Sequence, residues 1–409
     1  MKKTGIKKHF ATAWIQYFVL AGLILMLCGC GNGDSSDTVT IEVPASTQND
    51  IAPDEPSADE EEAVLEPEND AQEETASEEE QSTTVSENSL SEATVSGNQA
   101  DIMDGLTRDA DGVVRDDDGK MIVDLVMFMG QSNMSGTGGN PSYAPKVPEG
   151  HGYEFRAISD PTRLYPITEP FGINENNING IMDFAVAKKG SMVSAFANSY
   201  YEKTGVPIVA VSASQGGTDT DFWMKQSTMS DYAERQKRAQ VWLESNDYNI
   251  RKQYAVWLQG ESDSFSNITV EGYKQNMDNI IRPLFIGGLQ KVFIITTGRS
   301  ITNKDFYDTV IEAQIELCRD SGYYALATTA LSEVSTEYMV DEVHYNQSVL
   351  NLLGEQAAES AAYYTNNKRE MCLYDYKNHE TYIPDGFDYT GKEVVEPLDI
   401  NNDCGLMRY

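Results

Sequence analysis

Five short apolar runs, separated by segments of helical periodicity, limit most strongly what this chain can fold into. Each run is nearly continuous in apolar or β-branched residues, which is typical of strands buried on both faces. The runs are Met121 to Met129, Val206 to Ala213, Tyr254 to Gln259, Val292 to Thr297 and Tyr323 to Ala330. The helical segments are about 181–203, 229–246, 270–285, 304–320 and 347–365. This alternation predicts an α/β fold: a three-layer α/β/α sandwich with a central, mainly parallel five-stranded sheet.

The charge is distributed unevenly along the chain. The formal net charge is -35, from 65 acids and 30 bases. Residues 31–100 contain 20 of the acids and no Lys or Arg, and residues 1–30 contain four Lys and no acid, which leaves a net charge of -19 for residues 101–409. This balance excludes a nucleic-acid partner bound through phosphate neutralisation. It also favours a neutral or simple substrate over a strongly polyanionic one.

The first 29 residues have the pattern of an export leader. Basic residues precede a mostly apolar run, and Leu27-Cys28-Gly29-Cys30 follows it. This resembles a bacterial lipoprotein signal, in which the leader is cleaved before a cysteine that then carries lipid. The resemblance implies a signal peptide at 1–29, lipidation at Cys30 and an extracytoplasmic enzyme or binding protein anchored to the bacterial cell membrane. The alternative is an uncleaved membrane anchor, for which the run is at the lower length limit.

Residues 30–105 are predicted to be an acidic, disordered tether. No Phe, Tyr or Trp occurs between residues 31 and 127, so the segment cannot bury enough apolar area to offset its ordering entropy. A domain at 106–366 and a C-terminal extension at 367–409, to which the sequence assigns no role, complete the chain.

The chain has no pattern typical of a metal site. Residues 107–120 are rich in acids but lack calcium-loop spacing, and Asp118-Gly119 favours a hairpin turn instead. The sequence has no CxxC and no clustered His, which argues against structural zinc. Cys372 and Cys404 could form a disulfide in an oxidising compartment, and their spacing leaves this open.

Polar loops follow the predicted strands or lie near their ends, and three of the four contain glycine. Because ligands bind beyond the carboxyl ends of the strands in such sheets, these loops are the places to search for chemistry. Three come directly after strands one, two and three, and the fourth precedes the last helix. They are Gly130-Gln131-Ser132-Asn133-Met134-Ser135-Gly136, Ser214-Gln215-Gly216-Gly217-Thr218-Asp219, Gln259-Gly260-Glu261-Ser262-Asp263 and Asp341-Glu342-Val343-His344-Tyr345-Asn346.

The loops offer the three groups of a hydrolytic triad. Ser132 supplies a hydroxyl at a strand-to-helix switch, and His344 is one of few histidines in the chain. Asp341 lies three residues before His344, so one loop can present both the base and the carboxylate that orients it. The backbone N–H groups of Ser132 and of Gly216 or Gly217, with a side-chain amide, would form an oxyanion hole.

These four motifs, in this order, resemble the SGNH (GDSL-type) hydrolases over about residues 121–366. Within that superfamily the match is to the sialate O-acetylesterase and carbohydrate esterase family six group, which deacetylates sugars. The resemblance implies a flavodoxin-like sheet, Ser132 as nucleophile, His344 as base and Asp341 as its orienter. It implies no cofactor and no metal, and an acetylated carbohydrate as substrate.

The resemblance also assigns supporting roles. Gly216 or Gly217 and Gln259 correspond to the oxyanion partners, and Glu261 to an acid that braces the third loop, with Gln131 and Asn133 as further supporting residues. The wider superfamily has Asn where this chain has Ser262, which is why Gln259 is expected to supply the amide. The alternatives are a structural amide for Gln259 and a solvated carboxylate for Glu261.

Specificity is expected from outside these motifs. The insertion at 137–180 is rich in Gly, Pro and Asn, and long loops on a rigid sheet often determine specificity. Trp223 and Arg299 are candidates for the sugar pocket. Two other functions remain open from the sequence: a non-catalytic sugar-binding surface lipoprotein, and another SGNH esterase or lipase.

Overall fold

A computed structural model describes residues 107–408, except 110–111, 185, 387–388 and 390–393. The predicted leader at 1–29, the lipidation site Cys30 and the tether at 30–105 lie outside these residues. The described part belongs to one compact unit, Gly97–Tyr409. Among the described helices, none has the length and apolar character needed to cross a membrane.

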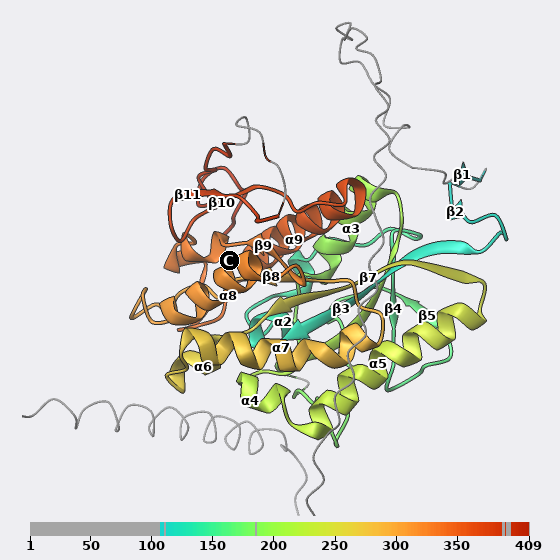
Figure 1. Ribbon diagram of the computed structural model, residues 1–409, viewed down its shortest axis with the longest axis horizontal. Helices are drawn as coiled ribbons and strands as arrows, with labels where there is room; N and C mark the ends of the chain where they lie inside the picture. Colours follow the sequence, from blue (N-terminus) through green and yellow to red (C-terminus); the bar gives the residue numbers. More distant parts are fainter. Residues whose placement is uncertain (1–106, 110–111, 185, 387–388, 390–393, 409) are drawn as a thin grey trace, which may run out of the picture. The chain divides into compact units, whose positions relative to one another are not determined.

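A mostly parallel sheet forms the centre of the domain (Figure 1), and its strand order is β5-β4-β6-β3-β7-β8-β9. The five predicted strands are all present and lie side by side in parallel pairs. Their bounds are β3 Met121–Gly130, β6 Ile208–Ser214, β7 Tyr248–Leu258, β8 Lys291–Ile295 and β9 Tyr324–Thr328. The prediction of an α/β sandwich around a mainly parallel sheet is therefore confirmed.

The sheet has nine strands in the described residues rather than the predicted five. Two come from the insertion: β4 pairs in parallel with β6, and β5 pairs antiparallel with β4. They are too short and too mixed in polarity to give the apolar run used to predict a strand. The other two are β1 and β2, which pair antiparallel with each other, and β2 pairs antiparallel with β3 across the expected turn at Asp118-Gly119, where Gly119 has φ +80°. These four strands are β1 Thr107–Arg108, β2 Val114–Arg115, β4 Gly152–Phe155 and β5 Leu164–Pro166.

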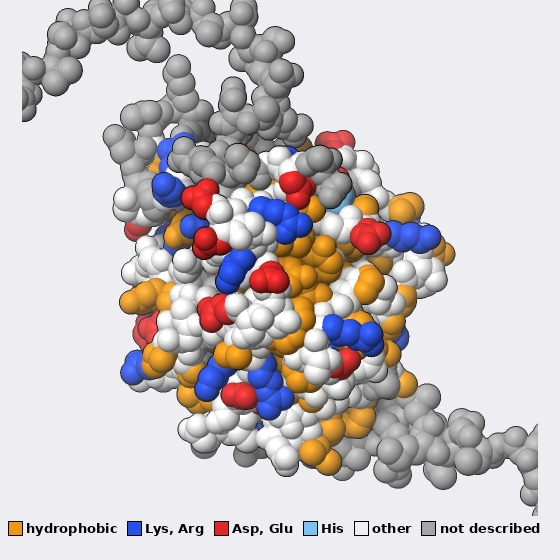
Figure 2. All heavy atoms as spheres, turned by 90° about the vertical axis from the view of Figure 1, so that its right-hand side faces the viewer, with side chains coloured by type: hydrophobic (Ala, Val, Ile, Leu, Met, Phe, Trp, Pro, Cys, Tyr) orange, Lys and Arg blue, Asp and Glu red, His pale blue; other side chains and the backbone are white. Residues whose placement is uncertain are grey.

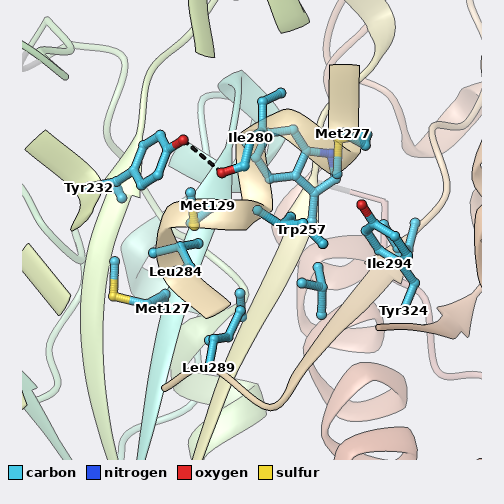
Figure 3. Close-up of a cluster of buried hydrophobic side chains, with 14 of the residues drawn as sticks. Met127, Met129, Tyr232, Trp257, Met277, Ile280, Leu284, Leu289, Ile294 and Tyr324 are labelled. Carbon is cyan, nitrogen blue, oxygen red and sulfur yellow. Dashed lines mark hydrogen bonds between the residues drawn. The ribbon is translucent and has the colours of Figure 1, made fainter. Parts of the chain in front are cut away.

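Helices cover both faces of the sheet, and β3 shows how its residues divide between them. Leu125, Met127 and Met129 pack against the layer formed by α5, α7 and α8, part of which is seen in Figure 3. Val126 and Phe128 pack against α3 and α9 on the opposite face. Successive side chains of a strand point to opposite faces, so one continuous apolar run serves two cores. The five helices are α3 Val193–Thr204, α5 Gln226–Ser245, α7 Val270–Ile286, α8 Asp308–Asp320 and α9 Gln347–Asn367.

One helix begins much later than the sequence predicts. The sequence predicts a helix over 181–203, but α3 starts at Val193 and residues 181–184 and 186–192 form a loop. Asp183 and Lys188 are polar yet buried there, because their side chains take part in hydrogen bonds beneath the loop. Shorter helices complete the fold: α2 Ser132–Ser135, α4 Thr220–Trp223, α6 Glu261–Phe265, and the 3-10 turns η1 Pro141–Tyr143, η2 Ala330–Ser332 and η3 Thr336–Tyr338.

The C-terminal extension packs onto the sandwich through a small hairpin, β10 Leu373–Asp375 and β11 Glu380–Tyr382. Ile400 is fully buried in the same core as α3 and α9. Cys372 and Cys404 are not joined by a disulfide. On the face seen in Figure 2, acidic and basic side chains are interspersed around a strip of hydrophobic ones.

Candidate active site

The turn after β3 holds Ser132 at the carboxyl edge of the sheet. Gly130 has φ +145°, and a Cβ there would lie 2.0 Å from the carbonyl oxygen of Leu258 on the neighbouring strand. Only glycine fits this backbone and this approach. The chain then enters α2, so the N–H of Ser132 lies in the first turn of a helix and has no partner within it. Ser132 is 8% exposed, which leaves it within reach of a ligand.

The loop before α9 joins His344 to Asp341. The Nδ1 atom of His344 lies 2.9 Å and 2.8 Å from the two carboxylate oxygens of Asp341. The backbone N–H groups of Val343 and His344 also donate to this carboxylate, at 3.0 and 2.9 Å. Burial alone would raise the pKa of Asp341, but the His344 ring and these amides together lower it. The carboxylate therefore holds the ring with Nδ1 protonated and leaves Nε2 to accept a proton.

Asn133 connects the loop of His344 to the turn of Ser132. Its Nδ2 atom donates to the carbonyl oxygen of Val343 at 3.1 Å, and its Oδ1 atom accepts from the N–H of Tyr345 at 3.3 Å. The residue next to Ser132 thus holds both neighbours of His344. The structure contains no hydrogen bond between the side chains of Ser132 and His344 themselves. Such bonds are often long or misaligned without substrate and tighten when it binds.

Glu261 is buried beneath this connection. Its Oε1 atom accepts from Asn133 Nδ2 at 2.7 Å, and its Oε2 atom has no hydrogen-bond partner among the described residues. Burial raises the pKa of Glu261, and the Asn133 hydrogen bond opposes that shift. A residue only 3% exposed is not a solvated carboxylate, so its contacts fit the bracing role.

The side chain of Gln259 does not fit the oxyanion role expected of it. Its Nε2 atom donates to the carbonyl oxygen of Thr218 at 2.8 Å and to the Asp263 carboxylate, and Gln259 is fully buried. A primary amide has two N–H donors, and both are used by these contacts. The contacts favour the structural alternative, in which Gln259 links the third loop to the loop after β6. Gln131, the other amide nearby, accepts from the N–H of Ser262 at 3.3 Å.

The glycine loop after β6 lies beside Ser132. A Cβ at Gly216 would be 3.5 Å from the Cβ of Ser132 and 3.6 Å from a carboxylate oxygen of Asp183. The N–H of Gly216 donates to Asp183 Oδ2 at 3.2 Å. Gly217 is exposed, has φ +71° and has open space where a Cβ would lie. Of the two glycines that the sequence left as alternatives, Gly217 therefore has its backbone open to a ligand.

Sequence reasoning missed Asp183 and Lys188, which were expected in the middle of a helix. Asp183 Oδ2 accepts from the hydroxyl of Ser135 at 2.6 Å. Lys188 Nζ donates to Ser214 Oγ at 3.0 Å, and Ser214 Oγ lies 2.9 Å from Ser135 Oγ. Burial lowers the pKa of Lys188 to about 8, although the nearby Asp183 charge opposes the shift. A buried acid and a buried base thus lie behind α2, the helix that begins at Ser132.

The two candidates for the sugar pocket have different positions. Trp223 is fully buried in the α5–α7–α8 core, where its Nε1 donates to Thr218 Oγ1 and its ring meets Trp257 edge to face. The prediction that Trp223 shapes the pocket is therefore wrong, because the side chain cannot reach a ligand. Arg299 is partly exposed beside Tyr345, whose hydroxyl accepts from its backbone N–H at 2.9 Å. Its Nε has no hydrogen-bond partner in the described part of the chain.

No group of three or more His, Cys, Asp and Glu side chains in the described residues is arranged to hold a metal ion.

The profile of a family described as carbohydrate esterase, sialic acid-specific acetylesterase, matches residues 122–363. The comparison with curated proteins gave no match. Among solved structures, a protein from Arabidopsis thaliana is 20% identical with a TM-score of 0.43, over 59% of this chain and 98% of its own.

Two further structures are similar at lower identity. A carbohydrate acetylesterase from Xanthomonas citri is 15% identical, with a TM-score of 0.40, over 64% of this chain and 62% of its own. The psychrotrophic esterase EstA from Pseudoalteromonas is 11% identical, with a TM-score of 0.33, over 60% of this chain and all of its own.

Proposed function

The chain belongs to the carbohydrate esterase family of sialic acid-specific acetylesterases, and on this premise we propose that it is a serine esterase that removes O-acetyl groups from a carbohydrate. The observation that best supports this is the link made by Asn133. Asn133 directly follows Ser132 and forms hydrogen bonds with both neighbours of His344. The Nδ1 atom of His344 in turn lies 2.8 Å from a carboxylate oxygen of Asp341. A sugar-binding protein without chemistry has no need of a histidine oriented in this way.

In the proposed reaction, Ser132 Oγ attacks the acetyl carbonyl carbon as His344 Nε2 takes the hydroxyl proton. The negative charge that develops on the carbonyl oxygen is stabilised by the N–H groups of Ser132 and Gly217. The sugar oxygen then leaves and takes the proton from His344, which gives an acetyl-enzyme. Water, deprotonated by the same imidazole, releases acetate and restores Ser132.

The test is acetate release from p-nitrophenyl acetate and from acetylated sugars. Ser132→Ala should lower kcat by at least about 10³-fold, because the nucleophile is lost, while the melting temperature stays close to that of the wild type. Ser266→Ala, at an exposed serine close to the third loop, is the control and should keep full activity. Undiminished acetate release by Ser132→Ala would refute the mechanism.

The acyl group and the sugar are tested separately. A carbohydrate acetylesterase should lose kcat/KM steeply from acetyl to butyryl and octanoyl esters. A lipase of the same superfamily would keep or gain rate along that series. Acetate release over a panel of acetylated glycans, including xylan and sialic acids, would identify the sugar.

We propose further that the enzyme works outside the cytoplasm, held to the membrane by lipid on Cys30. The basic leader, its apolar run and Leu27-Cys28-Gly29-Cys30 support this. Cells grown with a radioactive fatty acid should label the wild-type protein but not Cys30→Ala. Equal labelling of both would exclude the anchor.

A further inference from the structure

We infer that Asp183 is a positioning residue of the active site, an inference that rests on the proposed esterase function. Asp183 lies in the loop between β5 and α3 and is 5% exposed. One of its carboxylate oxygens accepts from two donors: the hydroxyl of Ser135 at 2.6 Å and the N–H of Gly216 at 3.2 Å. Ser135 ends the helix that begins at Ser132, and Gly216 belongs to the glycine loop. A single carboxylate oxygen therefore fixes the distance between α2, the helix that begins at Ser132, and the glycine loop.

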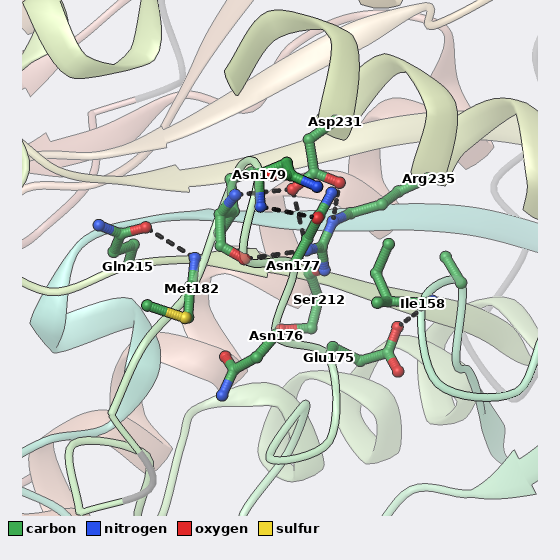
Figure 4. Close-up of polar contacts among 12 residues, drawn as sticks. Ile158, Glu175, Asn176, Asn177, Asn179, Met182, Ser212, Gln215, Asp231 and Arg235 are labelled. Atoms are coloured by element: carbon green, nitrogen blue, oxygen red, sulfur yellow. Dashed lines mark hydrogen bonds and ion pairs between the residues drawn. The ribbon is translucent and has the colours of Figure 1, made fainter. Parts of the chain in front are cut away.

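The loop holds this carboxylate in place without help from a substrate. The backbone N–H and carbonyl of Asp183 are both bonded by the side-chain amide of Asn176, at 2.9 and 2.8 Å. The preceding N–H groups, of Ile181 and Met182, donate to the side chains of Asp231 and Gln215, both at 2.7 Å (Figure 4). A side chain whose backbone is anchored on both sides is preorganised, as a positioning residue must be.

Lys188 supplies the charge that balances the buried carboxylate. It is 4% exposed and bonds Ser214 Oγ at 3.0 Å, and Ser214 is in contact with Ser135 at 2.9 Å. Two hydroxyls thus connect the ammonium to the carboxylate beneath Ser132. A buried acid is tolerated when it is hydrogen-bonded and has a cation nearby.

This arrangement determines which amide can meet the reacting oxygen. Because Asp183 accepts from the N–H of Gly216, that donor is already used and a second anion there would be repelled. The N–H of Gly217, an exposed residue with nothing within 4 Å of where a Cβ would lie, is left to face the substrate together with the N–H of Ser132. Asp183 thus acts through the glycine loop: it holds the N–H of Gly216, which leaves the N–H of Gly217 for the substrate.

The inference predicts opposite behaviour for two substitutions at one position. Asp183→Ala removes both hydrogen bonds, so kcat should fall by about 100-fold while KM changes by less than about threefold. Asp183→Asn keeps an oxygen that can accept from both donors, so kcat should stay within about threefold of wild type. Ser135→Ala removes one of the two bonds and should lie between them. Asp221→Ala, at an exposed acid in α4, is the control and should have wild-type kcat.

Each result has a defined meaning when Ser132→Ala is assayed beside these variants and melting curves show that all are folded. Loss with Ala and rescue with Asn supports the inference. Wild-type or higher kcat in Asp183→Ala overturns it, the latter because the carboxylate would then obstruct the site. Equal loss in Ala and Asn also overturns it, since charge rather than the bridge would matter. Full activity in Ser132→Ala would instead refute the proposed function, independently of how the Asp183 variants behave.

Discussion

At the scale of single residues, the geometry of the candidate site depends on buried side chains that connect its loops. Asn133 is the clearest case, because three hydrogen bonds of one amide connect the nucleophile turn, the His344 loop and Glu261. Such a group cannot be replaced by water without loss of geometry, since Asn133 is fully buried. Its contribution should therefore appear in both stability and catalysis.

Asn133→Ala should lower kcat by about 100-fold, because the His344 loop is released from Ser132 and a small misplacement of a catalytic base is costly. It should also lower the free energy of unfolding by about 1–3 kcal/mol, since buried donors and acceptors lose their partner. Acetate release and urea unfolding measure the two effects. Unchanged kcat together with reduced stability would show that Asn133 supports only the fold.

Lys188 predicts a pH dependence of stability. Its folded pKa of about 8 lies below its ordinary value of 10.5, mainly because burial disfavours the charged form. Below about pH 8 Lys188 is protonated in both the folded and the unfolded protein, and the folded protein bears the cost of a buried charge. Between pH 8 and 10.5 the unfolded chain binds more protons than the folded one, so stability contributed at this site rises with pH.

The measurement compares wild type with Lys188→Met. Their difference in unfolding free energy should shift in favour of wild type by about 3 kcal/mol between pH 7.5 and 10.5. Titration of the buried tyrosines affects both proteins and cancels in the difference. A difference independent of pH would show that Lys188 keeps its ordinary pKa in the folded protein.

At the scale of elements, the ends of the parallel strands explain why the site could be located from the sequence. Gly130 ends β3 with φ +145°, Gly260 lies just beyond the end of the neighbouring strand β7 with φ +142°, and polar residues follow each. Glycine at a strand end and polarity in the next loop can both be seen in a sequence, so Ser132 and Glu261 could be placed at one edge of the sheet, with His344 expected beside them in the polar loop ahead of the last helix. The resemblance of the motifs then supplied their expected roles.

The insertion could not be predicted in the same way. Segment 181–192 contains apolar residues at helical spacing, but long-range bonds from Asp231 and Gln215 hold its start in an extended loop. Asp183 is useful to the site only because of those partners, which are distant in sequence. For Gln259 the motif was misleading in the opposite way. Its position in the motif predicts a hydrogen-bond donor to the oxyanion, whereas Thr218 and Asp263, its neighbours in space, accept from both of its N–H groups.

Arg235 on α5 is the anchor of that loop, and its removal should disturb stability and catalysis together. It donates to the carbonyl of Ser212 on β6 at 2.7 Å and forms a buried ion pair with Asp231 at 3.0 Å. Arg235→Met leaves the Asp231 carboxylate buried without its partner, which should cost about 3–5 kcal/mol of unfolding free energy.

The same variant should lower kcat, because the segment that carries Asp183 loses its support. The double variant Asp231→Asn with Arg235→Met removes the uncompensated charge and should recover a part of the lost stability. If both variants unfold at the same urea concentration as wild type, the ion pair does not anchor the loop.

At the scale of the whole molecule, the C-terminal extension completes the active-site edge as well as the core. Met407 accepts from the side chain of Asn346 at 2.9 Å, and Asn346 caps α9 two residues after His344. The extension had no role predictable from its sequence, because the contacts that hold it to the domain, such as the hydrogen bond from the Tyr376 N–H to Thr329 Oγ1, join residues distant in the chain. Through this bond the extension supports the loop that carries His344.

The ion pair between Lys291 and Glu370 allows this contribution to be measured. Lys291 begins β8 and Glu370 follows α9, and the two lie 2.8 Å apart with both side chains buried. Burial raises the pKa of Glu370, and the charge of Lys291 opposes this shift.

Glu370→Ala leaves the Lys291 ammonium buried without its acid and should lower the free energy of unfolding by about 3–5 kcal/mol. Replacing both residues, with Lys291→Met and Glu370→Leu, removes the charge altogether and should restore most of that loss, because an apolar pair of similar volume is often as stable. Urea unfolding of the three proteins decides this: no loss in either variant would mean that the extension is held by its apolar contacts alone.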